Sequence, residues 1–483
     1  PYFEDLAEPI RRIFRLYGTR KLEMGLMDFD DLLINWSRLL AEHEDLRLKW
    51  AGHFEHILVD EYQDTNHLQG EIVDMMASEH GNLMVVGDDC QSIYAFRGAD
   101  YNNILEFPER FETCRQFKLE TNYRSTPQIL DLANQSIAHN VGQFEKTLRA
   151  HRAGGPEPVL IRVRDANQQA RFVCQRILEL VDEGYSLDDV AVLYRSHYHS
   201  LELQVELTRH KIPYIVRSGL RFFEQAHIKD VLAYLRFLYN PKDELAFMRL
   251  VRQWYGIGQK RAQEIWLFLS SQDDPYAALT STRLAESLPG RAAGSWTSAS
   301  KLLAKLRAQR LSHGPATMIT TILDGEYLDY LHNNYENSDH RVADLEQLGN
   351  YSDQFETVDE FLGEISLLTT ISGQEIAVGS EEKDESVCLS SIHQAKGLEW
   401  GACFVLWLSD GEFPNARAVH DDDQIEEERR LFYVATTRAK TGLYLCHPFT
   451  RRGRDGHTVV LRESEFLDEL DGPTPPFERW AID

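Results

Sequence analysis

The sequence lacks any long hydrophobic run. A helix needs roughly 20 mostly apolar residues to cross a bilayer, and the longest apolar run here, around Ala402–Leu408, is only long enough for a strand. A secretory signal peptide is not visible either. We therefore expect a protein that has no membrane partner and works in the cytoplasm.

Paired cysteines and an excess of basic charge are also missing. The six cysteines are scattered and form no CxxC pair, which argues for reduced thiols in a cytoplasm and against a zinc site or a disulfide framework. The chain has 51 Lys and Arg against 77 Asp and Glu, so its net charge is −26. Bulk charge therefore disfavours a nucleic-acid partner, and any contact with DNA would have to run through a local groove.

What is present is the composition of a globular protein with several domains. The chain has 483 residues, of which 43% are hydrophobic and 27% are charged. A chain of this length is expected to form about two to four domains.

The order of strand and helix patterns predicts a parallel α/β fold. Residues 1 to about 50 are helix-patterned, with apolar residues of Leu32–Leu40 at three- and four-residue spacing. Short apolar runs at Ile57–Val59 and Leu83–Val86 flank another helical pattern, and the alternation returns at Val159–Arg164. Pro127 suits the first turn of a helix because it lacks the N–H that would be unpaired there.

A long helical stretch, from about Ala226 to Ile371, interrupts the second set of strands. Within it, SLPGRAAGSWTSAS (Ser287–Ser300) has the composition of a loop. Gly373–Ser386 is a polar hinge, after which the strand patterns SVCLSSI, ACFVLWL and GLYLCHP resume. The tail after His447 is rich in Gly, Arg and Pro, and we expect it to be loosely ordered.

The stretch ILVDEYQDTN (Ile57–Asn66) joins an apolar run to two acids, Asp60 and Glu61. The apolar run predicts a buried parallel strand, and ligands bind beyond the carboxyl ends of such strands. Two carboxylates at that point suit Mg²⁺ and a base for an attacking water. The plainer interpretation is a strand that ends in a solvated acidic turn.

A second strand and loop, LMVVGDDCQSIYAFRGAD, follows this acidic pair. We expect both loops to emerge at the same edge of the sheet. Gln91 is an amide that can bind a phosphate oxygen or a water, and Tyr94 and Phe96 stand close to Arg97. Aromatic rings beside a cation suit stacking on bases and pairing with a phosphate, although such aromatics also serve simply as core residues.

Two further arginines follow strand and helix patterns. Arg124 lies next to Tyr123 in TNYRS, and Arg438 follows the apolar helix pattern of EEERRLFYVATTRAK. Arginine carries a permanent charge and binds phosphate through two parallel hydrogen bonds. A lone arginine in the position of Arg438 would ordinarily be a solvated helix end.

Together, these stretches resemble the superfamily 1 helicases of the UvrD/Rep/PcrA type. The motifs that carry the resemblance occur in the family's order and at its spacing over nearly the whole chain: MDFDDLL, VDEYQDTN, VVGDDCQSIYAFRGAD, LETNYRST, AVLYRS, FFEQAHIKD, IHQAKGLEW, DGEFP and EEERRLFYVATTRAK. The resemblance implies an α/β fold of two RecA-like parallel-sheet domains, the first incomplete, with a large α-helical inserted subdomain. It also implies an ATP-dependent 3′→5′ DNA helicase or translocase that uses ATP and Mg²⁺.

The resemblance assigns roles in ATP hydrolysis by position. Asp60 would hold Mg²⁺, Glu61 would orient or deprotonate the attacking water, and Gln91 would sense the γ-phosphate. The remaining roles would fall to residues of the second domain: Tyr123 on the adenine, Arg124 and Arg438 on the γ-phosphate, and Glu399 on the ribose.

The resemblance also implies contacts with DNA. Residues in motifs that line the single-strand track are Tyr94, Phe96, Arg97, Arg195 and His393. In WYGIGQKRAQEI, Gly256 and Gly258 resemble the family's turn that touches duplex DNA, where glycine lets backbone N–H groups approach a phosphate. The implied partners are single-stranded DNA, junctions with duplex DNA, and proteins of DNA repair or replication.

The family motifs that normally precede MDFDDLL are missing: the adenine-reading glutamine, the phosphate loop and the first DNA-contacting segment. The phosphate loop G-x-x-x-x-G-K-[ST] is absent, and no Gly-Lys dipeptide occurs in the chain. That loop cradles the phosphates through its backbone N–H groups and its lysine. The simplest expectation is that the chain is a C-terminal portion of a longer helicase. The alternative is a DNA-binding or partner-binding fragment that does not hydrolyse ATP.

The motifs set the expected domain boundaries. Residues 1–27 are expected to end a first helical insertion, and residues 28–115 to form the rest of the first RecA-like domain. The second RecA-like domain is expected to consist of residues 116–200 and 386–450, with its helical insertion at 201–385. Residues 451–483 would form the tail.

Overall fold

The computed structural model describes residues 7–111, 113–217, 222–310, 313–335, 337–366, 385–416, 418–452 and 457–482. The chain divides into two compact units. The first consists of Pro1–Glu120 and His139–Thr147, and the second of Thr121–Ala138 and Leu148–Asp483. Among the described residues, no helix is both long enough and apolar enough to span a membrane. The six cysteines are all free.

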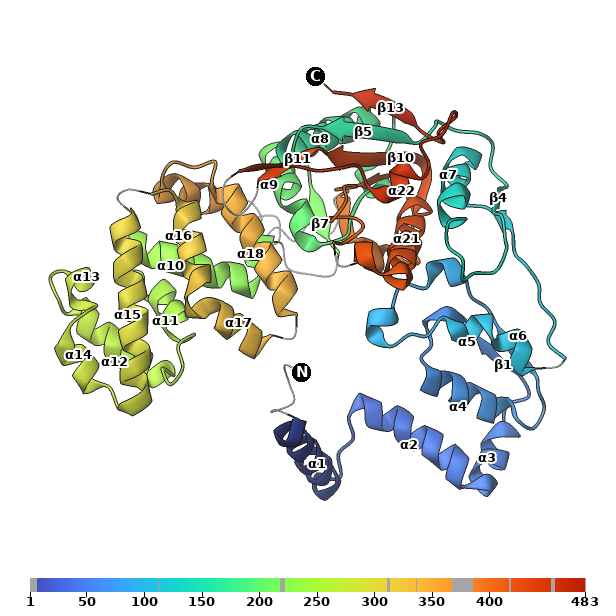
Figure 1. The fold of residues 1–483 in the computed structure, drawn as a ribbon, viewed down its shortest axis with the longest axis horizontal. Coiled ribbons are helices and arrows are strands. Elements are labelled where there is room, and N and C mark those ends of the chain that lie inside the picture. Colours follow the sequence, from blue (N-terminus) through green and yellow to red (C-terminus); the bar gives the residue numbers. More distant parts are fainter. Residues whose placement is uncertain are drawn as a thin grey trace. The chain divides into compact units, whose positions relative to one another are not determined.

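The first unit begins with helices, as the apolar spacing predicts. These are α1 (Ala7–Met24), α2 (Phe29–Glu42) and α3 (Glu44–Ala51) (Figure 1). Helix α2 begins where it does because Asp28 caps it: the Asp28 carboxylate accepts from the Asp31 N–H, and the Asp31 carboxylate accepts from the Asp28 N–H. The expected helical beginning of the chain is therefore confirmed for the described residues.

Two strands of the first unit pair in parallel. Strand β1 (Ile57–Val59) and β2 (Leu83–Val85) align Ile57 with Leu83, and α4 (His67–Ala77) connects them. The expected parallel pairing is confirmed, but the expected burial is wrong. Leu58 and Met84 are 72% and 54% exposed, because this pair is covered on one side only within the described chain.

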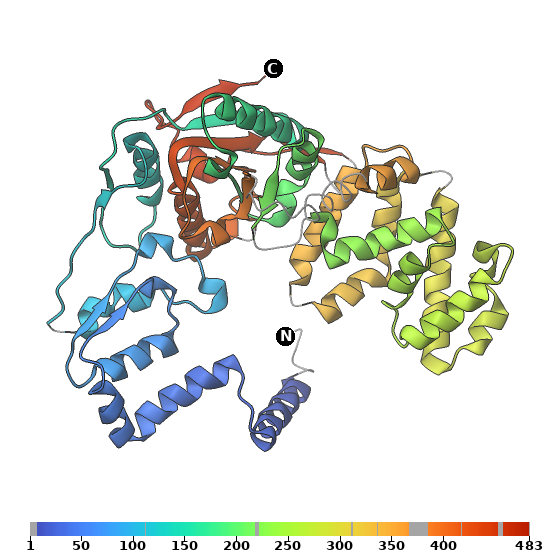
Figure 2. The same cartoon turned by 180° about the vertical axis from the view of Figure 1, so that it is seen from behind.

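The second unit contains a parallel sheet of seven strands in the order β13-β5-β10-β9-β6-β8-β7. Strands β13, β5, β10 and β7 of this sheet are labelled in Figure 1, and Figure 2 shows the unit from behind. Both faces of the sheet are covered, as is usual for parallel sheets, and all residues of the inner strands β6 and β8 are buried. The strands are β5 (Val159–Val163), β6 (Val190–Tyr194), β7 (Tyr214–Val216), β8 (Val387–Ser391), β9 (Trp400–Val405), β10 (Ala439–Pro448) and β13 (Glu478–Ala481).

Helices connect and cover these parallel strands. They are α7 (Pro127–Ile137), α8 (Ala166–Asp182), α9 (Leu201–Arg209) and α21 (Asp422–Thr436). Pro127 is the first residue of α7, as its missing N–H predicts.

The tail after His447 is not loosely ordered in its described part. It forms a hairpin of β11 (Thr450–Arg452) and β12 (Thr458–Val460), the short helix α22 (Glu465–Asp468), and the edge strand β13. Strand β13 pairs in parallel with β5, and Phe466 and Leu467 are fully buried. The composition misleads here because a few apolar residues are enough to dock a polar tail on an existing sheet.

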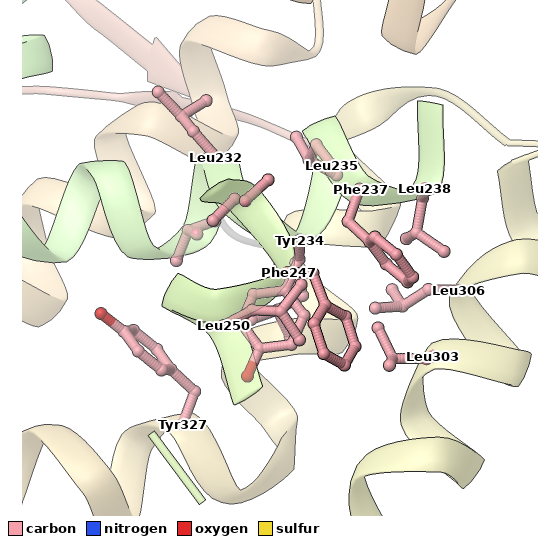
Figure 3. Packing of buried hydrophobic residues seen from close by; sticks show 14 of the residues in the cluster. Leu232, Tyr234, Leu235, Phe237, Leu238, Phe247, Leu250, Leu303, Leu306 and Tyr327 are labelled. Atoms are coloured by element: carbon pink, nitrogen blue, oxygen red, sulfur yellow. The ribbon is translucent and has the colours of Figure 1, made fainter. Parts of the chain in front are cut away.

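Between β7 and β8 the chain forms a cluster of helices around a core of its own, as the helical pattern predicts. Figure 3 shows part of this core, where Tyr234 and Phe237 of α10 lie near Phe247, Leu303 and Leu306. The main helices are α10 (Ala226–Tyr239), α11 (Glu244–Val251), α12 (Gln259–Ser270), α15 (Gly290–Arg310), α16 (Pro315–Ile322), α17 (Leu328–Asn334) and α18 (Ser338–Ser352).

The loop expected at Ser287–Ser300 is wrong, because most of this stretch is the first half of α15. Glycine and serine suggest a loop, yet Ala292, Trp296, Ala299 and Leu303 recur at helical spacing and are all buried. Burial of this stripe outweighs the weak local propensity. Most of the polar hinge expected at Gly373–Ser386 lies outside the described residues.

Helix α9 belongs to both cores of the second unit. Its Leu203 and Leu207 pack in the core of the sheet, and its Leu201 and Val205 pack in the core of the helical cluster. Glu202 lies between them and is 7% exposed. The Gln347 amide of α18 donates a hydrogen bond to its carboxylate.

We predict that Trp296→Ala lowers the free energy of unfolding by about 3–5 kcal/mol, because it removes a buried aromatic ring from the helical core. Urea unfolding followed by circular dichroism measures the loss. Thr297→Ala is the matched control, since Thr297 is exposed on the same helix and should change stability by less than about 1 kcal/mol. Equal losses would contradict the packing of α15.

A second prediction concerns pH. Burial raises the pKa of Glu202 from 4.5 to about 7. Between these values Glu202 keeps its proton in the folded protein and loses it in the unfolded chain, so its contribution to the free energy of unfolding falls as pH rises and is lost above about 7. In Glu202→Gln this fall should be smaller by about 2–3 kcal/mol between pH 5 and 8.

Urea unfolding at several pH values measures this difference. Glu157→Gln, which changes an exposed carboxyl of the same unit, should retain the parental pH profile. A parental profile in Glu202→Gln would show that Glu202 is ionised in the folded protein.

Candidate functional site

The acidic pair lies directly beyond the carboxyl end of β1. The Asp60 carboxylate accepts a hydrogen bond from the Glu61 N–H at 2.9 Å, and both residues are exposed. Glu61 has a φ of 51°, a left-handed conformation that is uncommon for a residue with a side chain. The chain turns sharply here and enters a short 3₁₀ turn at Tyr62–Asp64.

The two loops of the first unit meet at the same edge, as expected. The Tyr62 N–H donates to the Val86 carbonyl at 3.0 Å. Buried Gln63 connects the loops further, because its Nε2 donates to Glu61 Oε2 at 2.5 Å and its Oε1 accepts from the Asp88 N–H at 3.0 Å. Gln63 is therefore a positioning residue for Glu61 that the sequence analysis missed, although it stands within the same motif.

Gln91 lies in the second loop and is held by Asp88. Its Nε2 donates to Asp88 Oδ2 at 2.7 Å. Asp88, Asp89 and Cys90 bring three metal-ligating atoms within 4.8 Å of one another. Lys146 pairs with both carboxylates, however, so the chain itself supplies a cation at this point.

The aromatic residues of this loop lie beside a cation, as the sequence predicts. The Tyr94 and Phe96 ring centroids are 6.1 Å apart, and the Arg97 guanidinium carbon is 5.8 Å from the first and 5.6 Å from the second. Phe96 is 66% exposed. For this residue the simple core interpretation is therefore wrong.

In the second unit, Tyr123 and Arg124 lie on a turn between β3 (Thr121–Asn122) and α7. The Asn122 side-chain oxygen forms the turn by accepting from the Arg124 N–H at 2.8 Å and the Ser125 N–H at 2.9 Å. Tyr123 is 70% exposed, and its ring lies 4.9 Å from that of His151.

Arg124 and Glu399 form an ion pair across a long separation in sequence. Arg124 Nε lies 2.6 Å from Glu399 Oε2, and Lys440 Nζ lies 3.0 Å from Glu399 Oε1. Hydrogen bonds from Arg124 and Lys440 lower the pKa of Glu399. The Glu399 carboxylate thus pairs with two cations, Arg124 and Lys440, and the cluster has a net charge of +1.

Arg438 joins this group through the backbone. It is 1% exposed, so the solvated helix end is excluded. Its Nε donates to the Val434 carbonyl at 3.0 Å and its Nη1 to the Leu398 carbonyl at 3.2 Å. The Arg124 Nη1 donates to the adjacent Thr437 carbonyl at 3.3 Å. The structure therefore brings together Arg124, Glu399 and Arg438.

Arg152 was not identified from the sequence, where it stands in a loop of ordinary composition. Its Nη1 donates to the carbonyls of Arg124 and Lys440, both at 2.8 Å, and its Nη2 donates to Thr441 Oγ1 at 3.3 Å. The Thr126 N–H also donates to the Lys440 carbonyl at 3.2 Å. Arg152 thus clamps the turn that carries Tyr123 and Arg124 to the beginning of β10.

Arg195 and His393 lie at the opposite edge of the sheet from Arg438 and Glu399. They follow the carboxyl ends of β6 and β8, whereas Glu399 and Arg438 precede the amino ends of β9 and β10. Arg195 is paired with Glu428 of α21 at 2.7 Å. The parallel sheet therefore separates the residues assigned to nucleotide from those assigned to single-stranded DNA in this unit.

The two glycines expected to touch duplex DNA lie in the turn between α11 and α12. Gly256 has a φ of 78°, and a Cβ on it would lie 3.5 Å from the Ala292 backbone nitrogen near the beginning of α15. Gly258 precedes the first residue of α12. Exposed Tyr255 lies beside Arg291, which donates to its hydroxyl at 3.2 Å.

The architecture defines the class of the protein: a RecA-like parallel α/β fold with an inserted helical subdomain. Comparison with known protein families identifies the family within this class. The family described as UvrD/REP helicase N-terminal domain matches residues 2–112, and the family described as UvrD-like helicase C-terminal domain matches residues 117–447. The chain therefore belongs to the UvrD-like helicase family.

Relatives of known name agree with this membership. ATP-dependent DNA helicase PcrA of Leuconostoc citreum is 32% identical over 480 residues, which cover 96% of this chain and 63% of the relative. DNA helicase II of Escherichia coli K12 is 34% identical, and the match covers 97% of this chain and 66% of the relative. ATP-dependent DNA helicase Rep of the same strain is 32% identical, and the match covers 95% of this chain and 69% of the relative. The chain spans about two thirds of the length of these relatives.

We predict that Arg152→Ala loosens the turn at Tyr123 and Arg124, because two carbonyls lose a charged donor. Hydrogen exchange of peptides that cover Thr126 should become about tenfold faster, equivalent to roughly 1.4 kcal/mol. Arg149→Ala removes the same charge from a nearby exposed residue and should leave this exchange unchanged. Parental exchange in Arg152→Ala would rule out the clamp.

Proposed function

We propose that the protein is an ATP-dependent DNA helicase or translocase that moves 3′→5′ on single-stranded DNA. The observation that carries the proposal is the meeting of Arg124, Arg438 and Glu399, three residues far apart in sequence, at the amino ends of β9 and β10. The relatives named as ATP-dependent DNA helicases support it. The direction of movement follows from the family resemblance.

Residues of each unit, taken by itself, have the chemistry to hold part of a nucleotide with a divalent cation. The exposed Asp60 carboxylate offers the hard oxygen ligand that Mg²⁺ prefers. Exposed Tyr123 presents a ring face on which a base can stack, and the Glu399 carboxylate can accept from ribose hydroxyls. ATP bound with Mg²⁺ supplies the γ-phosphoryl group whose transfer to water drives the motor.

The residues around the phosphate position a water and neutralise charge. Glu61, held by the Gln63 amide, orients or deprotonates the attacking water, and Gln91 senses the γ-phosphate. Arg124 and Arg438 stabilise the charge that develops on the phosphoryl oxygens, an effect worth roughly 10³–10⁵ in rate for an arginine finger.

Residues of the DNA track bind without reading sequence. Phe96 and Tyr94 stack on bases, each stack contributing about 1–3 kcal/mol, and Arg97, Arg195 and His393 contact the strand. Gly256 and Gly258 approach the backbone of duplex DNA at a junction with the single strand. A role in DNA repair or replication follows from the family resemblance.

The second candidate is a DNA-binding chain without ATP turnover. The absence of a Gly-Lys dipeptide, and hence of a phosphate loop, in these 483 residues favours it. An ATPase assay of the chain with and without single-stranded DNA separates the two candidates. DNA-stimulated hydrolysis excludes the second, whereas DNA binding without hydrolysis supports it for this chain.

We predict that Glu61→Gln lowers DNA-stimulated ATP hydrolysis by at least about 10³-fold, because an amide cannot accept the proton of the attacking water. Nucleotide binding should survive, since the substitution keeps size and shape. Steady-state hydrolysis measures the first effect, and the binding of a fluorescent ATP analogue measures the second. Both are measured in the parent protein and in the variant.

Glu79→Gln is the control for this experiment, because it neutralises an exposed carboxyl of the same unit that precedes the amino end of β2, whereas Glu61 follows the carboxyl end of β1. It should retain the parental rate. If Glu61→Gln hydrolyses ATP as fast as Glu79→Gln, the role assigned to Glu61 is wrong.

A further inference from the structure

The chain passes from one unit to the other more than once. After Thr121–Ala138, which belongs to the second unit, residues His139–Thr147 return to the first unit, and the second unit resumes at Leu148. We call His139–Thr147 the return segment. Both of its ends continue into the second unit, and the chain just before it carries Tyr123 and Arg124.

The return segment is attached to the loop that carries Gln91. The Phe144 N–H donates to Asp89 Oδ2 at 3.0 Å, and Cys90 Sγ lies 3.5 Å from Gln143 Oε1. The Phe144 ring packs against the small core around Tyr62. A separate contact, away from the Gln91 loop, joins Lys118 Nζ to the Glu145 carbonyl.

Lys146 makes the strongest attachment. Its side chain is 19% exposed, and its ammonium pairs with Asp88 and, at 2.7 Å, with Asp89, whose side chain is only 3% exposed. Burial acts to lower the pKa of Lys146, but the neighbouring negative charges, Asp88 foremost, raise it above its ordinary value. The ammonium is therefore charged, and a charged group in a buried site needs its partners.

Asp88 connects Lys146 to Gln91. Its Oδ1 binds the Lys146 ammonium and accepts from the Cys90 N–H at 3.1 Å, while its Oδ2 accepts from Gln91 Nε2 at 2.7 Å. The carboxylate is thus fixed between a cation on the return segment and the amide assigned to the γ-phosphate. A shift of the return segment would move this carboxylate and, with it, the Gln91 amide.

We propose that Lys146 is a positioning residue that couples the return segment, through Asp88, to Gln91. Movement of the chain on either side of the return segment then reaches the γ-phosphate sensor through one ion pair and one hydrogen bond. The proposal rests on the proposed function for the role of Gln91, but the attachment itself does not depend on ATP hydrolysis.

The first test measures hydrogen exchange in the chain as it stands. Lys146→Met should speed exchange at least about tenfold in peptides that cover residues 88–91 and in those that cover the return segment. Lys118→Met is the matched control, because Lys118 holds the same segment without reaching Asp88; it should affect only the return segment. Unchanged exchange at residues 88–91 in Lys146→Met overturns the proposal.

The second test compares DNA-stimulated ATP hydrolysis by the parent protein and by its variants. Lys146→Met should lower kcat about tenfold or more while KM for ATP changes less than about threefold, and Lys146→Arg should restore most of the loss. Combining Lys146→Met with Gln91→Ala should cost no more than Gln91→Ala alone, because one residue acts through the other.

The outcomes separate the two proposals. Additive losses of kcat in the double variant, or equal losses in Lys146→Met and Lys118→Met, mean a general structural role and overturn the positioning role. Asp88→Asn guards against a misfolded Lys146→Met, since it leaves the Asp89 contact in place and should show the same fall in kcat. If the parent binds DNA but never hydrolyses ATP, the proposed function fails, and the exchange result still decides the attachment.

Discussion

Parallel pairing of strands is the constraint on which the arrangement of this protein depends. Parallel strands need long crossovers, so the neighbours in the seven-stranded sheet come from segments far apart in sequence. All strands point the same way, and their amino ends therefore share one edge. Glu399 precedes β9 and Arg438 precedes the adjacent β10. Arg124 reaches the same edge because Thr126 and Ser125 bond to the beginning of β10.

The same constraint separates two groups of candidate residues. Arg195 follows the carboxyl end of β6, and its partner Glu428 lies on α21, the helix that ends just before Arg438. One rigid helix therefore connects the residues at one edge of the sheet with the arginine at the other. Each charged group carries its own partner, a carboxylate for Arg195 and Arg124 and backbone carbonyls for Arg438, since unpaired charges would be costly at sites withdrawn from solvent.

Local patterns of the sequence were sufficient for the helices, the parallel strands and the loops that follow them, because these follow from apolar spacing, capping and turn residues. The capped beginning of α2, Pro127 at the beginning of α7, and the meeting of the two loops beyond β1 and β2 are examples. Patterns failed at Ser287–Ser300 and in the tail after His447, where glycine-rich and polar stretches are nonetheless ordered. In both places burial of a few apolar side chains outweighs local preference.

By itself, the sequence determined the α/β class, the helical insertion and the identity of the chemical groups, since motifs in a given order and spacing carry this information without coordinates. Only the tertiary structure decided which groups meet. Arg152 and Lys146 stand in stretches that no motif marks, and Gln63 stands in a motif that gives it no role of its own; all three have partners 25 to 288 positions away. Hydrogen bonds and ion pairs act over a few ångströms in space. The separation of two residues in sequence does not predict that distance when the chain between them crosses the sheet.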